Sequence, residues 1–234
     1  MRDSTYQRRR DQLTTYFDET AAAAWQALTS TNPVSRLRAT VRAGRDEMRR
    51  TLLDWLPEDL SGATLLDAGC GTGSLAIDAA RRGASVIAID VAGNLVDIAA
   101  RRASREGVLS AIEFTVGDML ADAPEEIDFV VAMDSLIHYN VNDVQDVIAG
   151  FTARARRSVL FTSAPWTPPL AMMHFVGRLI PARHHRAPSI EPIKVEQLMA
   201  MLDETHQQDG WHATRTRRIK CGFYFSQAVE LTRC

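Results

Sequence analysis

The stretch "LLDAGCGTGSLAIDAA", residues 65–80, decides the fold. An apolar run reaches the acidic Asp67, three glycines follow at alternate positions, and a helical pattern begins directly after them. Glycine has no Cβ atom, so a ligand can lie close against the backbone of such a turn. In open α/β sheets, ligands bind at the carboxyl ends of the strands, so the turn is expected to belong to a binding site.

The run that leads into this turn is the first of several short β-branched runs, and helical patterns separate them. Most of the runs are continuously apolar, which is typical of parallel strands that are covered on both faces. The alternation of strand and helix predicts a doubly wound α/β sheet. The expected strands are 64–69, 85–90, 112–118, 127–134 and 158–163.

Three segments flank or interrupt this alternation. Residues 1–60 look helical and are predicted to form an N-terminal lid ahead of a binding domain at 61–234. Residues 164–192 hold six prolines and a basic patch, which predicts a long loop or lid inserted after the fifth strand. The tail alternates apolar and polar residues around "KCG" at 220–222, which predicts an antiparallel hairpin at the sheet edge.

The composition excludes several classes of protein. The chain has 234 residues, of which 46% are hydrophobic and 24% are charged, and no apolar run is long enough to span a membrane. The three cysteines are far apart and fit a reducing compartment, so we expect a cytoplasmic protein without a metal site of its own. There is no strong basic excess, so we do not expect a nucleic-acid partner.

The net charge of −2 hides an uneven distribution along the chain. Residues 61–150 carry 5 basic and 14 acidic side chains, whereas residues 151–234 carry 12 basic and 6 acidic ones. One interpretation is chance combined with solvated helix faces. The other is that the middle of the chain binds a cation and the C-terminal part meets an anion.

The spacing of the glycines discriminates between ligands. Gly69, Gly71 and Gly73 form a G-x-G-x-G pattern, which is neither a dinucleotide fingerprint nor a P-loop. Asp67, directly before the turn, would repel a pyrophosphate and attract a cation. Asp90, at the end of the second strand, can accept hydrogen bonds from both hydroxyls of a ribose.

The end of the third strand adds an adenine site to this pattern. Asp118 can accept a hydrogen bond from an exocyclic adenine amine, and Met119 can cover the ring. An adenosine with a positively charged, non-phosphorylated arm is therefore predicted, and S-adenosylmethionine (SAM) fits this description. The alternative is that Asp67 and Asp90 only cap helices.

Two family resemblances rest on these residues and on further segments. "LLDAGCGTG", Asp90 and "GDM" resemble the class I SAM-dependent methyltransferases over residues 60–164, which implies a seven-stranded, mostly parallel sheet with an antiparallel last strand. Nearly the whole chain also resembles the magnesium-protoporphyrin IX O-methyltransferases. The segments that carry this second resemblance are "YFDETAAAAWQAL" at 16–28, "VRAGRDEM" at 41–48, "MDSLIHY" at 133–139 and "GFYFSQAVEL" at 222–231.

The second resemblance implies a reaction and its partners. One propionate of magnesium-protoporphyrin IX is expected to be methylated in chlorophyll or bacteriochlorophyll synthesis, giving the monomethyl ester and S-adenosylhomocysteine (SAH). Magnesium then arrives only as part of the substrate. The resemblance also implies the large subunit of magnesium chelatase as a partner and, at most, peripheral contact with a membrane.

The acceptor site follows from the chemistry of a carboxylate. Carboxylic acids titrate near about 4–5, so a propionate is ionised at pH 7 and needs orientation rather than a strong base. His138 and Tyr16 are the residues that we expect to orient it. The residues expected to contact the rest of the acceptor are Phe17, Tyr139, His174 and Arg178.

Two other functions stay open from the sequence. The first is methyl transfer to another small acceptor, such as a quinone precursor or a carboxylic acid. The second is a porphyrin-carrying module that retains the fold without turnover. The intact glycine turn, together with Asp90 and Asp118, argues against the second alternative.

Overall fold

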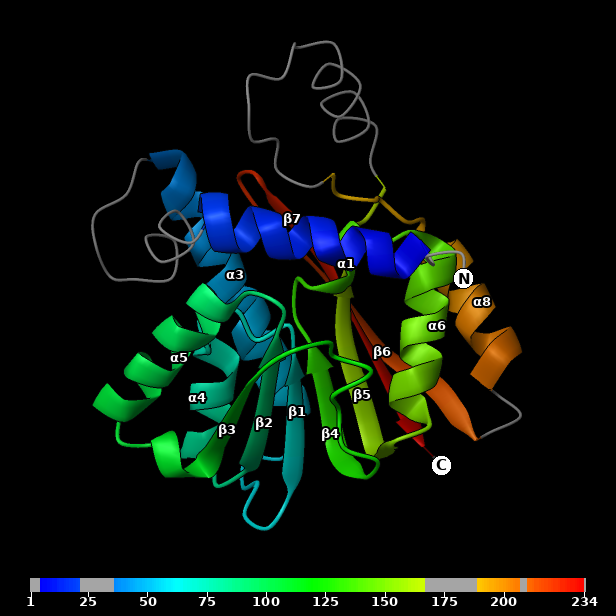
Figure 1. Ribbon diagram of the computed structural model, residues 1–234. Coiled ribbons are helices and arrows are strands. Elements are labelled where there is room, and N and C mark those ends of the chain that lie inside the picture. Colours follow the sequence, from blue (N-terminus) through cyan, green and yellow to red (C-terminus); the bar gives the residue numbers. More distant parts are fainter. Residues whose placement is uncertain (1–4, 22–35, 167–188, 207–209, 234) are drawn as a thin grey trace.

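A seven-stranded sheet forms the centre of the computed structural model, which describes residues 5–21, 36–166, 189–206 and 210–233 (Figure 1). The strands are arranged in the order β3-β2-β1-β4-β5-β7-β6. Five of them are parallel, namely β1 (Thr64–Ala68), β2 (Ser85–Asp90), β3 (Ile112–Val116), β4 (Ile127–Ala132) and β5 (Ala155–Ser163).

The last two strands form a hairpin at one edge of the sheet. β6 (Trp211–Cys221) pairs antiparallel with β7 (Tyr224–Arg233), and β7 pairs antiparallel with β5. The predicted edge hairpin and the seven-stranded, doubly wound sheet are thereby confirmed. Because the chain winds outward from β1 to β3 and then returns to place β4 on the other side of β1, the strand order reverses between β1 and β4. This is the point at which an open α/β sheet binds its ligands.

Helices cover both faces of the sheet (Figure 1). Alternate residues of the parallel strands therefore lie in two separate cores, one on each face. In β1, Leu65 lies in one core and Leu66 in the other. The first core also contains residues of α3 (Arg36–Trp55) and α4 (Ser74–Arg81). The second contains residues of α6 (Val141–Thr152) and α8 (Val195–His206). α5 (Gly93–Arg105) lies beside β2 and β3. The short helix η2 (Leu109–Ala111) precedes β3, and the short helix η3 (Leu136–His138) follows β4.

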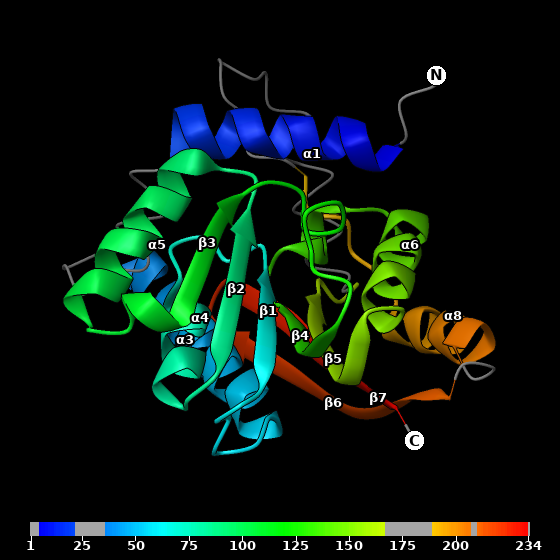
Figure 2. The ribbon, with the colours of Figure 1, turned by 60° about the horizontal axis from the view of Figure 1, so that its bottom comes forward.

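The N-terminal region has two parts with different surroundings. α1 (Thr5–Thr15) and the π-helix η1 (Tyr16–Ala21) lie across the carboxyl ends of the strands (Figures 1 and 2). By contrast, α3 packs on the sheet, where its Met48 and Leu52 are fully buried. Among the described residues of the predicted lid at 1–60, the part that lies over the strand ends is therefore α1 with η1.

The predicted insertion is described only at its two ends. Pro165 forms an isolated bridge with Ile193, and residues 189–194 then run to the start of α8. His174 and Arg178 lie outside the described residues, and their roles stay predictions. No helix within the described ranges has both the length and the apolar character needed to cross a bilayer.

Candidate active site

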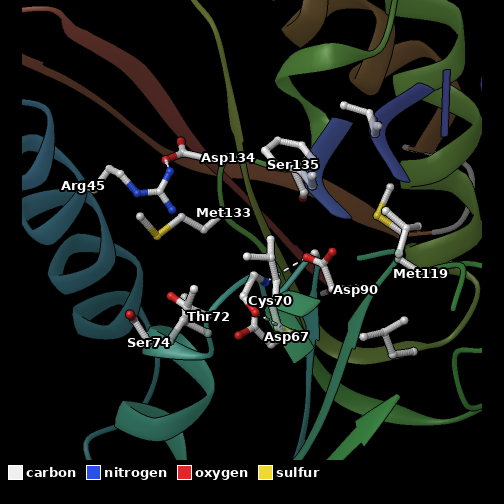
Figure 3. Close-up of a pocket in the computed structure, with 18 of the residues that line it drawn as sticks. Arg45, Asp67, Cys70, Thr72, Ser74, Asp90, Met119, Met133, Asp134 and Ser135 are labelled. Carbon is white, nitrogen blue, oxygen red and sulfur yellow. Dashed lines mark hydrogen bonds and ion pairs between the residues drawn. The ribbon is translucent and has the colours of Figure 1, made fainter. Parts of the chain in front are cut away.

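A cavity of about 550 Å³ lies where the strand order reverses (Figure 3). Its floor is the glycine turn after β1, and its walls come from the ends of β2 and β4, from α1 and η1, and from α3. Its volume lies within the range of about 300–1,000 Å³ that small-molecule sites occupy. The position and size both fit a site for a ligand as large as SAM.

The three glycines of the turn all have left-handed backbone conformations, but the space beside each of them differs. A Cβ atom on Gly69 would clash with Cβ of Ser135, and one on Gly73 would lie 2.8 Å from Cβ of Ala99. A Cβ atom on Gly71 would meet nothing within 4 Å, and Gly71 lines the cavity. Gly69 and Gly73 thus allow close packing, whereas the space beside Gly71 is left for a ligand.

Asp67 and Asp90 both line the cavity and both bind backbone amides. An oxygen of Asp67 accepts the N–H of Ala76 in the first turn of α4, at 3.0 Å. The two oxygens of Asp90 accept the N–H groups of Gly71 (2.8 Å) and Ala92 (2.9 Å). These carboxyl groups therefore hold the turn in shape and also face the cavity, so the capping alternative and the ligand role are compatible.

Burial controls the protonation of these two carboxylates. It raises the pKa of Asp67 to about 7, with only partial compensation by the N–H of Ala76 and with a further increase from the nearby Asp90. Burial also raises the pKa of Asp90. Since a cation stabilises the charged form of a carboxylate, a positively charged ligand would shift both groups toward ionisation.

Asp118 contacts the N-terminal helix, a partner that the sequence analysis missed. Its oxygens accept hydrogen bonds from the hydroxyl of Tyr6 (3.1 Å) and from Nη1 of Arg10 (3.1 Å), besides two backbone N–H groups of the following turn. Burial alone would raise the pKa of Asp118, but these donors outweigh it and the pKa is lowered. Met119 lines the cavity, and the adenine contacts of both residues stay predictions.

The structure brings the predicted acceptor residues of the N-terminus and of the β4 end together. The ring of Phe17 lies 5.1 Å from that of Tyr16 and 6.2 Å from that of His138, both edge-on. The ring of Tyr139 stacks on that of Tyr6 at 5.0 Å. Phe17, His138 and Tyr139 line the cavity, and Tyr16 adjoins it through Phe17.

Hydrogen bonding fixes the tautomer of His138. Its Nδ1 lies 3.3 Å from the carbonyl oxygen of Ser189, and a carbonyl only accepts, so Nδ1 carries the proton. Burial lowers the pKa of His138 from 6.5, so the ring is neutral at pH 7 and its Nε2 is an acceptor. Burial raises the pKa of Tyr16, and its hydroxyl therefore remains a donor at neutral pH.

α3 adds arginines to the cavity that the sequence analysis did not select. Arg42, Arg45 and Arg49 all line the cavity, and their spacing of i, i+3 and i+7 places them on one face of a helix. Nη1 of Arg45 lies 2.7 Å from a carboxylate oxygen of Asp134 (Figure 3). The helical spacing within "VRAGRDEMRR" was the available signal, but nothing in the sequence indicates which helix face meets the cavity.

The end of β4 also carries two polar residues that were not selected. Asp134 has a left-handed backbone with φ of 55°, unusual for a residue other than glycine. The hydroxyl of Tyr224 donates to both of its oxygens, at 2.9 and 3.1 Å. Oγ of Ser135 is buried in the cavity wall without a hydrogen-bond partner among the described residues. An acid and a serine directly after an apolar strand were the signal for this pair.

The reversal point, the glycine turn, the acid at the end of β2 and the antiparallel last strand define a class I SAM-dependent methyltransferase. In agreement, a methyltransferase-domain family model matches residues 65–157. A second model, described as the magnesium-protoporphyrin IX methyltransferase C-terminus, matches residues 132–233. The magnesium-protoporphyrin O-methyltransferase of Rhodobacter capsulatus is 40% identical over 228 residues, which cover 97% of this chain and 98% of that relative. The chain belongs to the magnesium-protoporphyrin O-methyltransferase family.

Further relatives extend this family across plants and cyanobacteria. The chloroplastic magnesium protoporphyrin IX methyltransferase of Arabidopsis thaliana is 30% identical over 92% of this chain and 68% of its own length. The crystal structure of magnesium protoporphyrin IX methyltransferase (ChlM) from Synechocystis PCC 6803 with bound SAH superimposes with a TM-score of 0.84. It has 26% sequence identity and covers 97% of this chain and 100% of that one.

Proposed function

We propose that this protein transfers the methyl group of SAM to a propionate carboxylate of magnesium-protoporphyrin IX and releases the monomethyl ester and SAH. The observation that carries the proposal is the 40% identity to the Rhodobacter capsulatus enzyme over nearly the full length of both chains. The shared length includes the edge hairpin, which lies outside the general methyltransferase-domain match at residues 65–157.

The residues of the cavity suit the demands of a methyl transfer from a sulfonium. When bound, SAM supplies an electrophilic methyl group on a positively charged sulfur. Asp90 holds the ribose hydroxyls, the open space beside Gly71 admits the cofactor to the backbone, and the charge of Asp67 favours the cationic centre. These contacts orient the donor toward the end of β4.

The acceptor carboxylate is held by hydrogen bonding rather than by a strong base. The hydroxyl of Tyr16, whose pKa is raised by burial, donates to one carboxylate oxygen and leaves the other free to attack. The neutral His138 presents Nε2 as an acceptor, so it donates to the carboxylate only in the protonated state. α1 and η1 act as a lid and exclude water, which strengthens these interactions.

The remaining assignments concern the macrocycle and the second propionate of the acceptor. Phe17 and Tyr139 contact the macrocycle, and His174 and Arg178, which lie outside the described residues, are assigned to acceptor binding from the family resemblance. The basic charge of residues 151–234 favours the second propionate. Binding to the large subunit of magnesium chelatase and peripheral contact with a membrane are further proposals from the family resemblance.

A panel of acceptors tests the proposal. The protein is incubated with SAM and either magnesium-protoporphyrin IX, metal-free protoporphyrin, their dimethyl esters, or a quinone precursor, and the products are analysed by mass. The expected result is a gain of one CH₂ on the magnesium porphyrin, with the dimethyl esters unchanged. Transfer to the quinone precursor with the porphyrin unchanged would overturn the acceptor assignment and leave the methyltransferase class intact.

A further inference from the structure

A short segment, residues 189–191, lies between α1 and η3. Its C-terminal side is fixed to the end of β5, because the N–H of Ile193 donates to the carbonyl oxygen of Ala164 at 2.9 Å and Ile193 is buried. Pro192 directly follows Glu191, and the residue before a proline is held away from the helical conformation. The segment therefore reaches β5 as extended chain.

Backbone groups of this segment hold η3 at two points. The N–H of Glu191 donates to the carbonyl oxygen of Ile137 at 2.8 Å. The carbonyl oxygen of Ser189 lies 3.3 Å from Nδ1 of His138, which carries the proton. Both the main chain before His138 and the ring itself are therefore held by residues 189–191.

The side chain of Glu191 connects the same segment to α1. Its Oε1 pairs with Nη2 of Arg9 at 3.1 Å and accepts the hydroxyl of Ser189 at 3.0 Å. One carboxylate oxygen thus joins α1 to the residue whose carbonyl group fixes His138. Among the described residues that line the cavity, neither Arg9 nor Ser189 nor Glu191 occurs, so this link acts on the cavity through His138.

We propose that Glu191 is a positioning residue for His138. Its carboxylate holds residues 189–191 against α1, so that the carbonyl group of Ser189 keeps the proton on Nδ1 and Nε2 remains the nitrogen that is available to the acceptor. The hydrogen bond that one ring nitrogen makes decides the state of the other, so loss of the Ser189 contact releases both tautomers. This role rests on the proposed function, in which His138 faces the acceptor carboxylate.

The charges of the ion pair also reach the imidazole. Burial lowers the pKa of His138, and the charge of Arg9 lowers it as well. The hydrogen bond with Ser189 and the charges of Asp134 and Glu191 raise it. The side chains of Arg9 and Glu191 are 24% and 38% exposed, and ion pairs of this kind contribute little to folding stability. We therefore expect the pair to matter for the orientation of His138 more than for the stability of the fold.

Nitrogen chemical shifts of the histidine rings test the proposal without any acceptor. The full chain is labelled with a heavy nitrogen isotope in its histidines, and the signals of His138 are identified by their absence in His138→Gln. At neutral pH the wild type is expected to show the Nδ1–H tautomer alone. Glu191→Ala is expected to show both tautomers. Glu191→Gln, whose amide oxygen still accepts from Arg9, is expected to retain the wild-type tautomer.

Turnover of the same variants completes the test. At saturating SAM and magnesium-protoporphyrin IX, Glu191→Ala is expected to lower turnover about tenfold or more, because a misplaced orienting group is costly. The SAM dissociation constant and the midpoint of thermal unfolding are expected to stay unchanged. Arg9→Met removes the same contact from the side of α1 and is expected to give the same pattern. Arg8→Met, at an exposed position of the same helix, is expected to retain the wild-type tautomer and turnover.

The possible outcomes separate this proposal from the proposed function. A wild-type tautomer in Glu191→Ala overturns it, as does a change of tautomer that leaves turnover unchanged; if Glu191→Ala does not fold, Arg9→Met decides in the same way. An equal loss of SAM affinity and turnover also overturns it, since the residue would then act on the cofactor or on the fold. Absence of turnover in the wild type would instead contradict the proposed function, and the tautomers, measured without acceptor, would still decide whether Glu191 positions His138.

Discussion

Gly69 and Gly71 belong to the same turn, but a side chain would meet different surroundings at each of them. Gly69→Ala would place a methyl group against Ser135, whereas Gly71→Ala would place one in the open cavity. Both substitutions cost about 1–2 kcal/mol for a left-handed conformation, and Gly69→Ala adds about 1–3 kcal/mol of overpacking. Urea unfolding should therefore show a larger loss of stability for Gly69→Ala. Calorimetry should show weaker SAM binding by a folded Gly71→Ala, and unchanged affinity would contradict the assignment of the turn.

The raised pKa of Asp67 predicts a pH dependence of cofactor binding. A group whose pKa is raised to about 7 by burial is largely protonated below that value, and a cation that prefers the charged form must displace the proton. SAM affinity should therefore increase as the pH rises from about 5.5 to about 7, with release of a proton. Calorimetry at pH 6 in buffers of different ionisation enthalpy measures that proton. It should disappear in Asp67→Asn, and equal proton release by the two proteins would exclude Asp67 as its source.

The acceptor residues should affect turnover more than cofactor binding. His138→Ala removes a ring that lines the cavity, and Tyr16→Phe removes the hydroxyl proposed to hold the acceptor carboxylate. Each should lower turnover about tenfold or more, which is about 1.4 kcal/mol of transition-state stabilisation. Residual activity should survive, because an ionised carboxylate is already nucleophilic. Turnover is measured at saturating SAM, alongside the SAM dissociation constant. A variant that loses SAM binding altogether would place its residue in the cofactor site or in the core.

Asp67, Asp90 and His138 could be selected from the sequence because each lies at or near the carboxyl end of an expected strand. Parallel strands bring their carboxyl ends to one edge of the sheet, so Asp67, Asp90 and His138 could be assigned to one site without coordinates. Arg45 could not, because the direction in which a helix face points depends on its packing against β6 and β7. The contact of Asp118 with α1 could not be predicted either, because it joins residues more than 100 positions apart in the sequence.

α1 is attached to the strand ends mainly by polar contacts. Thr5 donates to Asp143, Arg9 pairs with Glu191, and Arg10 pairs with Asp118. Leu13 is its buried hydrophobic residue. Leu13 is the residue that α1 adds to one of the two sheet cores, and the other buried residues of both cores come from other elements. α1 therefore contributes to the closure of the cavity more than to the fold.

Removal of residues 1–21 should therefore leave a folded sheet with little turnover. The truncated protein loses Tyr6, Leu13 and Phe17 from the cavity lining but keeps α3 and the glycine turn. We expect a cooperative thermal transition, weakened SAM binding, and turnover reduced by about tenfold or more at saturating substrates. Normal turnover by the truncated chain would show that α1 and η1 take no part in the active site.

The architecture of the whole chain could be predicted because one rule connects sequence to topology. Continuous apolar runs separated by helices lead to a doubly wound sheet, and the alternating tail leads to an antiparallel edge; both were confirmed. The extent of the lid could not be predicted, because helical periodicity is the same whether a helix covers a cavity or packs on a sheet. α1 and α3 illustrate the difference, since Met48 of α3 is fully buried in the sheet core.

The identity of the acceptor is the central claim about the molecule, and one competition measures it directly. SAM carrying a trideuterated methyl group is incubated with the full chain and an equimolar mixture of magnesium-protoporphyrin IX and a quinone precursor. Both acceptors are then analysed by mass. The account predicts one deuterated methyl ester on the magnesium porphyrin and none on the quinone precursor. Label on the quinone precursor, or two labels on the porphyrin, would contradict it.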